Sequence, residues 1–176
     1  APLAKLATAR LAVASASEYV ECFGGAGYVE DTGVPRLLRD AQVLPIWEGT
    51  TNVLALDALR ATVRDRASEA LLQRLDAATD IARRLHPALS DSLAVATARL
   101  RTEMGEVLAD PQSPLVVAGA RGLALRMAYA LGTALLVEQA AWGDELAEAA
   151  APLWARRWLR GEDIAADAHR DLEVLC

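Results

Sequence analysis

The residue types best suited to chemistry lie together at residues 47–52, which read Trp-Glu-Gly-Thr-Thr-Asn. A carboxylate that packs against an indole loses part of its hydration, which makes it a stronger proton acceptor and suits a general base that removes a proton from carbon. Gly49 lets a flat ligand approach the backbone, and the hydroxyls, the amide and the helix start that follow suit a pyrophosphate. The alternative, which the spacing alone favours, is that Glu48 precedes a capped helix and faces water.

A second candidate is the glycine run at residues 24–27. It is not a phosphate-binding P-loop, because the Lys-Ser/Thr ending is missing. No strand precedes it, as a dinucleotide-binding fingerprint would require. On the local pattern, a cap and turn after a helix is the favoured interpretation.

The remaining polar candidates are weaker. His86 and His169 are too few and too far apart for a recognisable metal site, so no metal is predicted. Cys22 could be a reactive thiol, but a small apolar residue near a helix end is the favoured role.

A basic and aromatic cluster comes near the end of the chain. Three arginines at 156, 157 and 160 accompany Trp154 and Trp158. We interpret it as a solvated helix face with buried indoles rather than as a nucleic-acid contact. The net charge of −6, from 18 basic and 24 acidic residues, agrees, because binding to phosphates needs a basic surface.

The elements that position these residues are predicted to be helices. The chain has 176 residues, 53% of them hydrophobic, which excludes a disordered protein. Its apolar residues are mostly Ala and Leu, and Lys5 is the only lysine, so arginine carries nearly all the positive charge. These residue types favour an all-α fold. Two cysteines make a disulfide framework improbable and favour a reducing, cytoplasmic location.

The first part of the chain reads as helices around one irregular segment. Residues 3–22 form one amphipathic helix by the spacing of Leu6, Val13 and Val20, and residues 34–40 form a short one. Residues 42–47 are predicted to be extended, because Pro45 lacks a backbone donor and disfavours a helical Leu44. A long helix follows residue 52. The apolar side chains predicted to lie on one face of this helix are Val53, Leu56, Leu59 and Val63.

The second part reads as a helical bundle. A helix is predicted from about residue 68 to 85, and another begins at Ser90-Asp91 and continues through residue 107. Residues 115–137 are the most apolar stretch, but Arg121 and Arg126 favour a central bundle helix over a membrane span. Glycines at 143 and 161 separate two last helices. The chain begins without Met and without a secretory signal, which led us to expect a piece of a longer protein.

Three motifs, in the order in which they follow along the chain, resemble those of a known protein family. They are Glu-Cys-Phe-Gly-Gly-Ala-Gly-Tyr at 21–28, Arg-Leu-Leu-Arg-Asp-Ala at 36–41 and Ile-Trp-Glu-Gly-Thr-Thr-Asn at 46–52. Together they resemble the C-terminal signature of the flavin-dependent acyl-CoA dehydrogenases, with a close match over residues 3–64. The long helical extension is similar to that of the larger branch of this family, which includes the DNA-alkylation-response flavoproteins.

The resemblance implies specific roles. It makes Glu48 the base that removes the α-proton of an acyl-CoA thioester while a hydride leaves the β-carbon for FAD. It places Gly49 against the substrate, and it implies that the backbone amide of the base donates to the thioester carbonyl. It assigns Thr50, Thr51 and Asn52 to the FAD of the same subunit. It assigns a second set to the FAD of a neighbouring subunit, which implies a homo-oligomer: Glu21, Cys22, Phe23, Gly24 and Gly25.

Some features depart from most of the family. Trp47 replaces the usual Tyr, and Glu21 and Asn52 stand where many members have Gln. The alkylation-response branch shares these choices, which argue against efficient turnover of short-chain or medium-chain substrates. The family's N-terminal helical domain and β-domain, which supply most FAD and CoA contacts, are not in this sequence.

The predicted organisation has two parts. Residues 1–66 are expected to be the C-terminal acyl-CoA dehydrogenase helices, with the flavin and base segment at 21–52, and residues 67–176 an additional helical bundle. The leading hypothesis is an acyl-CoA dehydrogenase domain, inactive alone, whose electron acceptor could be an electron-transfer flavoprotein. The alternatives are a flavoprotein that binds DNA, which the acidic charge disfavours, and a structural oligomerisation bundle.

Overall fold

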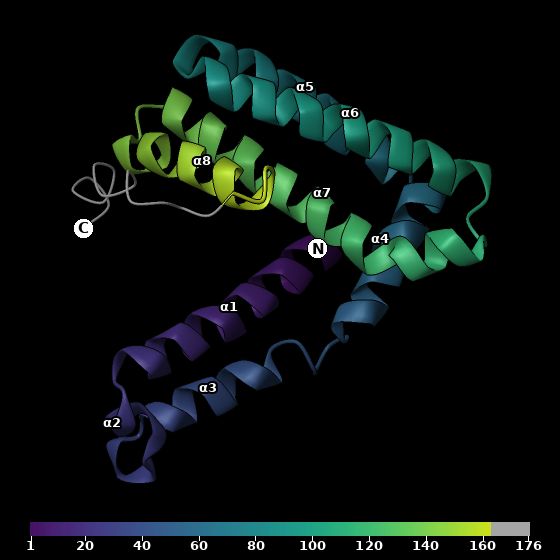
Figure 1. Cartoon of the computed structure of the whole chain (residues 1–176). Helices are drawn as coiled ribbons and strands as arrows, with labels where there is room; N and C mark the ends of the chain where they lie inside the picture. Colours follow the sequence, from purple (N-terminus) through teal and green to yellow (C-terminus); the bar gives the residue numbers. More distant parts are fainter. Residues whose placement is uncertain (163–176) are drawn as a thin grey trace. The chain divides into compact units, whose positions relative to one another are not determined.

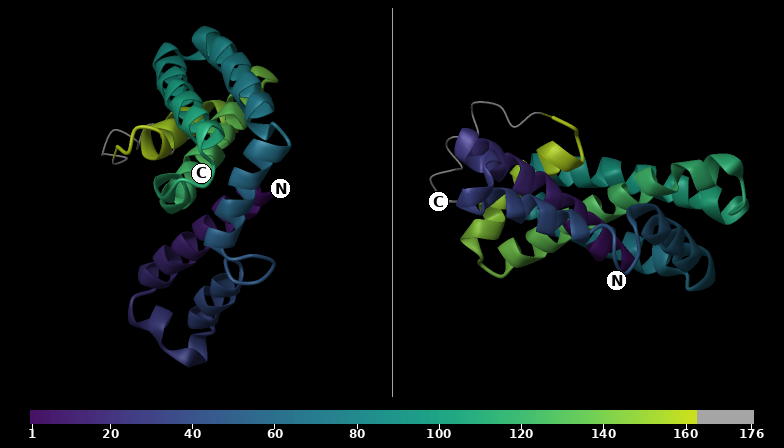
Figure 2. Two further views of the ribbon diagram at one scale, coloured as in Figure 1. Left: turned by 90° about the vertical axis from the view of Figure 1, so that its right-hand side faces the viewer. Right: turned by 90° about the horizontal axis from the view of Figure 1, so that it is seen from below.

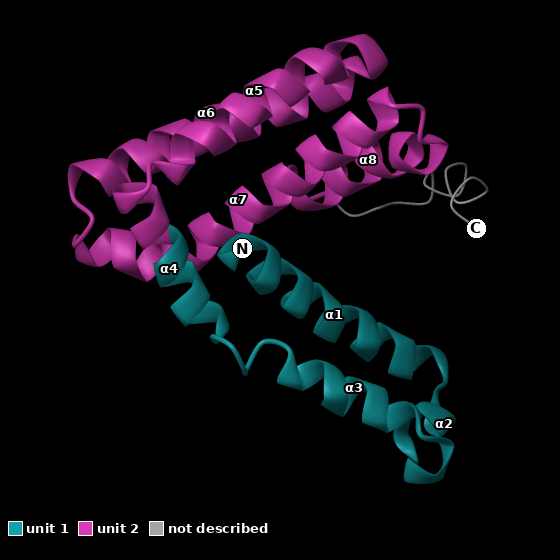
Figure 3. Cartoon of the chain, turned by 180° about the vertical axis from the view of Figure 1, so that it is seen from behind, with its two compact units in different colours: residues 1–58 teal, residues 59–176 magenta. Residues whose placement is uncertain are grey.

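A computed structural model describes residues 1–162 of the chain (Figure 1). These residues form eight α-helices and one 3-10 helix and contain no β-strand, which confirms the all-α prediction. The chain divides into two compact units, residues 1–58 and residues 59–176 (Figure 3). The predicted functional boundary at residue 66 stays a prediction.

Unit 1 is a helical hairpin closed by short helices. Helices α1 and α3 lie side by side and run in opposite directions, and α2 packs against both (Figures 1 and 2). Prolines in the first turns of α1 and α3 suit positions whose amides have no helical partner. The elements are α1 (Pro2–Cys22), α2 (Gly25–Tyr28), the 3-10 helix (Glu30–Thr32) and α3 (Val34–Val43).

The predicted apolar face of α1 is only partly buried. Leu6 is 1% exposed, whereas Val13 and Val20 are half-buried. The single helix was correctly predicted, but its face is weakly amphipathic because alanines occur on all sides of it.

The glycine run does more than end α1. As predicted, α1 stops at Cys22, but residues 25–28 then form one further helical turn instead of an open turn. Gly27 is buried in that turn, and a Cβ there would lie 2.0 Å from the carbonyl oxygen of Val20. Glycine is therefore required at Gly27 by the close approach of α2 to α1.

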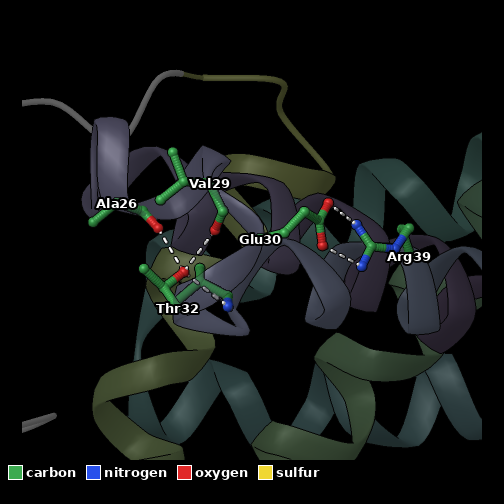
Figure 4. Close-up of polar contacts among 6 residues, drawn as sticks. Ala26, Val29, Glu30, Thr32 and Arg39 are labelled. Carbon is green, nitrogen blue, oxygen red and sulfur yellow. Dashed lines mark hydrogen bonds and ion pairs between the residues drawn. The ribbon is translucent and has the colours of Figure 1, made fainter.

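Polar contacts hold the 3-10 helix to its neighbours (Figure 4). The Thr32 hydroxyl donates to the carbonyl oxygens of Ala26 and Val29, at 2.7 and 3.0 Å. Arg39 of α3 forms a two-point ion pair with Glu30, at 2.7 and 2.8 Å. The pKa of Glu30 is lowered, chiefly because Arg39 donates hydrogen bonds to its charged form.

The prediction of an extended segment at residues 42–47 is wrong. Helix α3 continues to Val43, and residues 44–48 form turns. Leu44 adopts the right-handed helical conformation that Pro45 was expected to disfavour. Tight turns that need no proline donor explain this: Leu44 N–H donates to Ala41, and the N–H groups of Ile46 and Trp47 donate to Val43.

Helix α4 (Thr51–Arg64) begins in unit 1 and ends in unit 2. The helix was predicted, but its predicted face was mostly wrong. Val53 and Val63 are exposed and Leu56 is half-buried, so only Leu59 of that face is buried. The buried residues follow a different stripe: Thr51, Leu54, Ala55, Ala58, Leu59 and Thr62.

Unit 2 is a bundle of four long helices in which α7 contacts the other three (Figures 1 and 2). Its core is made of aliphatic side chains at helical spacing, and Leu75, Leu93 and Val137 are fully buried. The predicted fold of a helical bundle is confirmed here. The helices are α5 (Ala67–Leu85), α6 (Pro87–Ala109), α7 (Pro114–Ala141) and α8 (Glu145–Trp158).

Helix α6 starts earlier than the predicted Ser90-Asp91. The ring nitrogen Nδ1 of His86 accepts a hydrogen bond from the N–H of Leu89, which caps the helix, and Pro87 occupies its first turn. The Gly143-Asp144 boundary was correctly predicted, and Asp144 caps α8 by accepting from the N–H of Ala147 at 3.0 Å. The last predicted helix, with His169 and Cys176, lies outside the described residues.

Helix α7 is long and apolar enough to cross a membrane by length and composition, which core helices of soluble proteins also satisfy. Its contacts with α5, α6 and α8 agree with the predicted bundle role. Arg126 of α7 bonds to Glu103 of α6 at 3.0 Å, and Glu103 also pairs with Arg99 at 2.9 Å.

Candidate functional site

Glu48 sits on the turn between α3 and α4 in an uncommon backbone conformation. Its φ is 55°, a left-handed value that few residues other than glycine adopt, and Gly49 follows at φ 110°. Such conformations persist where surrounding structure imposes them, and they are concentrated at functional sites. The turn therefore fixes the direction in which the Glu48 carboxylate and its amide leave the backbone.

Lys5 holds this turn from α1. Its ammonium Nζ donates to the carbonyl oxygen of Trp47 at 3.0 Å and also to that of Leu44, the residue that caps α3. A cation at a helix C-terminus also interacts favourably with the helix dipole. Reasoning from the sequence missed this residue, although a single lysine in a chain otherwise charged by arginine was a usable signal.

The expected shielding of Glu48 by its neighbour is wrong for the described residues. Trp47 is 61% exposed and Glu48 is also exposed. The left-handed turn presents both side chains outward, and no described residue covers them. The Glu48 carboxylate is thus accessible to a ligand, but residues 1–162 do not themselves remove water from it.

The residues after Glu48 form a compact start to α4. A Cβ at Gly49 would lie 3.0 Å from the side chain of Leu54, so a side chain there would crowd the helix as well as strain the backbone. Thr51 is buried, whereas Thr50 and Asn52 are exposed and available to a ligand. The helix N-terminus beside them supplies amide groups of the kind that bind anions.

The second predicted set lies at the other end of the hairpin. Glu21, Cys22 and Phe23 end α1 and are exposed, and the rings of Phe23 and Tyr19 contact each other at 4.9 Å between centroids. Gly24 and Gly25 have open space where a Cβ would be. The ten residues of α3, about 15 Å of helix, separate this end from the Glu48 turn.

The described residues fit part of a flavin site. Open backbone at Gly24 and Gly25 admits a flat or anionic group, and the start of α4 offers hydroxyl, amide and backbone donors. The two sets are at opposite ends of one hairpin, separated by the length of α3. Neither end encloses a ligand within residues 1–162.

The residues of the basic and aromatic cluster near the end of the chain have partners within the described structure. The arginine cluster is engaged, because Arg156 and Arg160 both pair with Glu162 and Arg157 lies 5.5 Å from the centre of the Trp158 ring. Trp154 donates to the carbonyl oxygen of Tyr129 at 3.0 Å. Among residues 1–162, no three potential metal ligands of the His, Cys, Asp and Glu types come together.

Comparison with known proteins finds a family to which the first third of the chain is similar. Residues 1–63 match the model of the acyl-CoA dehydrogenase C-terminal domain. The recognition made from the three motifs is confirmed.

The relatives are much longer than this chain. Over 59 residues it is 68% identical to acyl-CoA dehydrogenase family member 11 of Caenorhabditis elegans, covering 34% of the chain and 10% of that protein. It is 39% identical over 77 residues to the putative acyl-CoA dehydrogenase AidB of Escherichia coli, covering 41% of the chain and 14% of that protein. The matched stretches thus span only about a tenth of the length of these relatives.

A solved structure extends the similarity to the whole chain. Caenorhabditis elegans ACDH-11, crystallised in complex with C11-CoA, matches with a TM-score of 0.63 and 31% identity. The match covers 98% of this chain and 31% of that one. The helical bundle of unit 2, which lies beyond the matched family model, therefore has a counterpart in ACDH-11.

Proposed function

We propose that this chain supplies the base and part of the flavin site of an FAD-dependent acyl-CoA dehydrogenase, with Glu48 removing the α-proton of an acyl-CoA thioester. The observation that carries this proposal is the exposed Glu48 carboxylate on a left-handed turn, next to Gly49 and the start of α4. The family match over residues 1–63 supports it.

The proposed reaction forms a carbon–carbon double bond. Glu48 takes the α-proton, the electron pair of that C–H bond becomes the second bond between Cα and Cβ, and the β-hydrogen departs with its electron pair. FAD, when bound, supplies the acceptor for that hydride. This chain's own part is to hold the carboxylate beside Cα and to donate a hydrogen bond to the thioester carbonyl, whose oxygen gains negative charge as the proton leaves.

The proposal extends to a substrate class and to partners. ACDH-11 binds C11-CoA, which supports an acyl-CoA thioester as the substrate class. The exposure of Trp47 and Glu48 supports a role for further domains in enclosing the substrate. The resemblance, which assigns the Glu21–Gly25 stretch and the Thr50–Asn52 stretch to different FAD molecules, supports a homo-oligomer. The proposed cytoplasmic location rests on the use of only two cysteines.

The test is the Glu48→Gln variant of the intact flavoprotein, mixed with an acyl-CoA without oxygen. We expect FAD to be retained and the rate of flavin bleaching per bound FAD to fall at least about 100-fold, a typical effect of losing a general base. Glu18→Gln is the matched control, because Glu18 is an exposed carboxylate on α1. Bleaching of Glu48→Gln at the control rate would exclude the proposed role.

A further inference from the structure

The peptide group that joins Trp47 and Glu48 has a hydrogen-bond partner for only one of its two polar groups among residues 1–162. Its carbonyl oxygen accepts a hydrogen bond from Lys5 at 3.0 Å, whereas its N–H, which belongs to Glu48, has no acceptor among residues 1–162. The peptide is trans, so the carbonyl and the N–H point in opposite directions in one plane. Fixing the oxygen therefore fixes the direction of the free N–H.

We propose that Lys5 is a positioning residue that aims and polarises the Glu48 amide as a hydrogen-bond donor to the thioester carbonyl. This inference rests on the proposed function, in which Glu48 takes the neighbouring α-proton. The same residue then supplies both groups: its side chain removes the proton, and its amide stabilises the charge that the removal creates.

The positive charge of Lys5 also makes the Glu48 N–H a stronger hydrogen-bond donor. An ammonium that donates to a peptide carbonyl draws electron density toward the oxygen, which makes the N–H of the same peptide a better donor. Lys5 is half-buried, but both of its hydrogen bonds are exposed to solvent, so water screens part of this polarisation while the geometric effect remains. Its second bond, to the carbonyl of Leu44, ties the ammonium to the end of α3 and limits its movement.

The backbone at Glu48 makes such support necessary. A left-handed conformation outside glycine is strained and persists only where the surroundings impose it. Without Lys5, the Trp47–Glu48 peptide can rotate toward a more ordinary conformation, which would turn the N–H away from the substrate. Lys5 acts through the peptide and does not itself touch the reacting atoms.

The experiment compares Lys5→Met and Lys5→Arg in the intact flavoprotein, with Arg10→Met as the matched control. Arg10 is an exposed cation of the same helix, so its replacement removes the same charge away from the turn. The first readout is the limiting rate of flavin reduction by acyl-CoA, expressed per bound FAD. We expect Lys5→Met to lower it at least about tenfold with little change in substrate affinity, and Lys5→Arg to recover part of the loss.

The second readout does not depend on turnover. The infrared stretching frequency of the thioester carbonyl, measured for an isotope-labelled product enoyl-CoA bound to each variant, reports the hydrogen bonds to that oxygen. We expect a higher frequency in Lys5→Met than in Arg10→Met, because the donor is weaker or misaligned. A purely structural Lys5 would change FAD content or thermal stability but leave the frequency and the rate per bound FAD unchanged, and that result would overturn the inference.

The two proposals fail in different ways. If Glu48→Gln reduces the flavin at the control rate, the proposed base is wrong regardless of Lys5. If Glu48→Gln is inactive but Lys5→Met matches Arg10→Met in both readouts, only the inference about Lys5 is wrong. Loss of FAD from Lys5→Met with an unchanged rate per remaining flavin also counts against the inference.

Discussion

The two units of this chain differ in the size of their apolar cores. In unit 2 several large side chains are fully buried between helices, including Leu75, Leu93 and Val137, whereas in unit 1 Leu6 is the large side chain that is buried as completely among the described residues. Large apolar side chains are exposed in both units, including Trp47 at 61% in unit 1 and Leu115 at 85% in unit 2. The comparison indicates that unit 2 supplies most of the apolar core, whereas the proposed ligand contacts lie in unit 1.

The largest stability effect is expected in the core of unit 2. Leu93→Ala removes a side chain that is 0% exposed and leaves a cavity, so it should lower the free energy of unfolding by about 2–5 kcal/mol. Urea unfolding of the 176-residue chain measures it. Leu115→Ala is the control, because Leu115 is 85% exposed and its loss should cost little. Equal effects of the two variants would contradict the assignment of the core.

A smaller effect is expected where unit 1 is most tightly packed. Gly27→Ala places a Cβ 2.0 Å from the carbonyl oxygen of Val20, so α2 must shift, at a cost of about 1–3 kcal/mol. Amide hydrogen exchange of residues 25–43 should become faster.

Gly105→Ala provides a control that is expected to change the free energy of unfolding in the opposite direction. Gly105 lies in α6 with open space around the Cβ position, so alanine should stabilise the chain by about 0.4–1 kcal/mol. If Gly27→Ala were as benign as Gly105→Ala, the close packing of α2 on α1 would be wrong.

The smallest expected effect on stability comes from ion pairs, and one pair in each unit allows the two units to be compared. Arg74 forms a two-point pair with Glu138 of α7, whose side chain is 19% exposed, and hydrogen bonds from Arg74 lower the pKa of Glu138. The Glu30–Arg39 pair of unit 1 is more exposed. Arg74→Met should therefore destabilise the chain by up to about 1 kcal/mol, and added salt should weaken the Glu30–Arg39 pair more.

The pH dependence of that effect has a definite sign. The folded pKa of Glu138 is lowered, so its contribution is fully present above the unfolded value of about 4.3 and is lost as the pH falls through the folded pKa. The difference between wild type and Arg74→Met, measured by urea unfolding, should shrink as the pH falls below about 4. A difference that grew with acidity would contradict the pairing.

The sequence predicted the helices well and their details less well. Helical periodicity correctly predicted α5 and the fold class, because aliphatic residues at regular spacing have few other ways to be buried. It failed for α4, where the buried stripe contains Leu54, Ala55 and Ala58 in place of Val53 and Val63. It also failed at residues 42–47, where local hydrogen bonds outweigh the preference that Pro45 imposes on Leu44.

The candidate site was predictable only as a set of residue types. The motif around Glu48 could be found from its sequence, but its left-handed backbone and its exposure could not. The contact from Lys5 to the Trp47 carbonyl joins residues 42 positions apart, and no local pattern reports such a contact. The assignment of individual residues to substrate and FAD stays a prediction.

The central claim, that unit 1 carries chemistry and unit 2 carries stability, is tested most directly by measuring two quantities on two variants of the intact flavoprotein. The quantities are the rate of flavin reduction per bound FAD and the midpoint of thermal unfolding, and the variants are Glu48→Gln and Leu93→Ala. We predict that Glu48→Gln lowers the rate of flavin reduction and leaves the midpoint of unfolding unchanged, and that Leu93→Ala lowers the midpoint and leaves the rate unchanged. A variant in which both the rate and the midpoint fell, or a Glu48→Gln protein with the wild-type rate, would contradict the account.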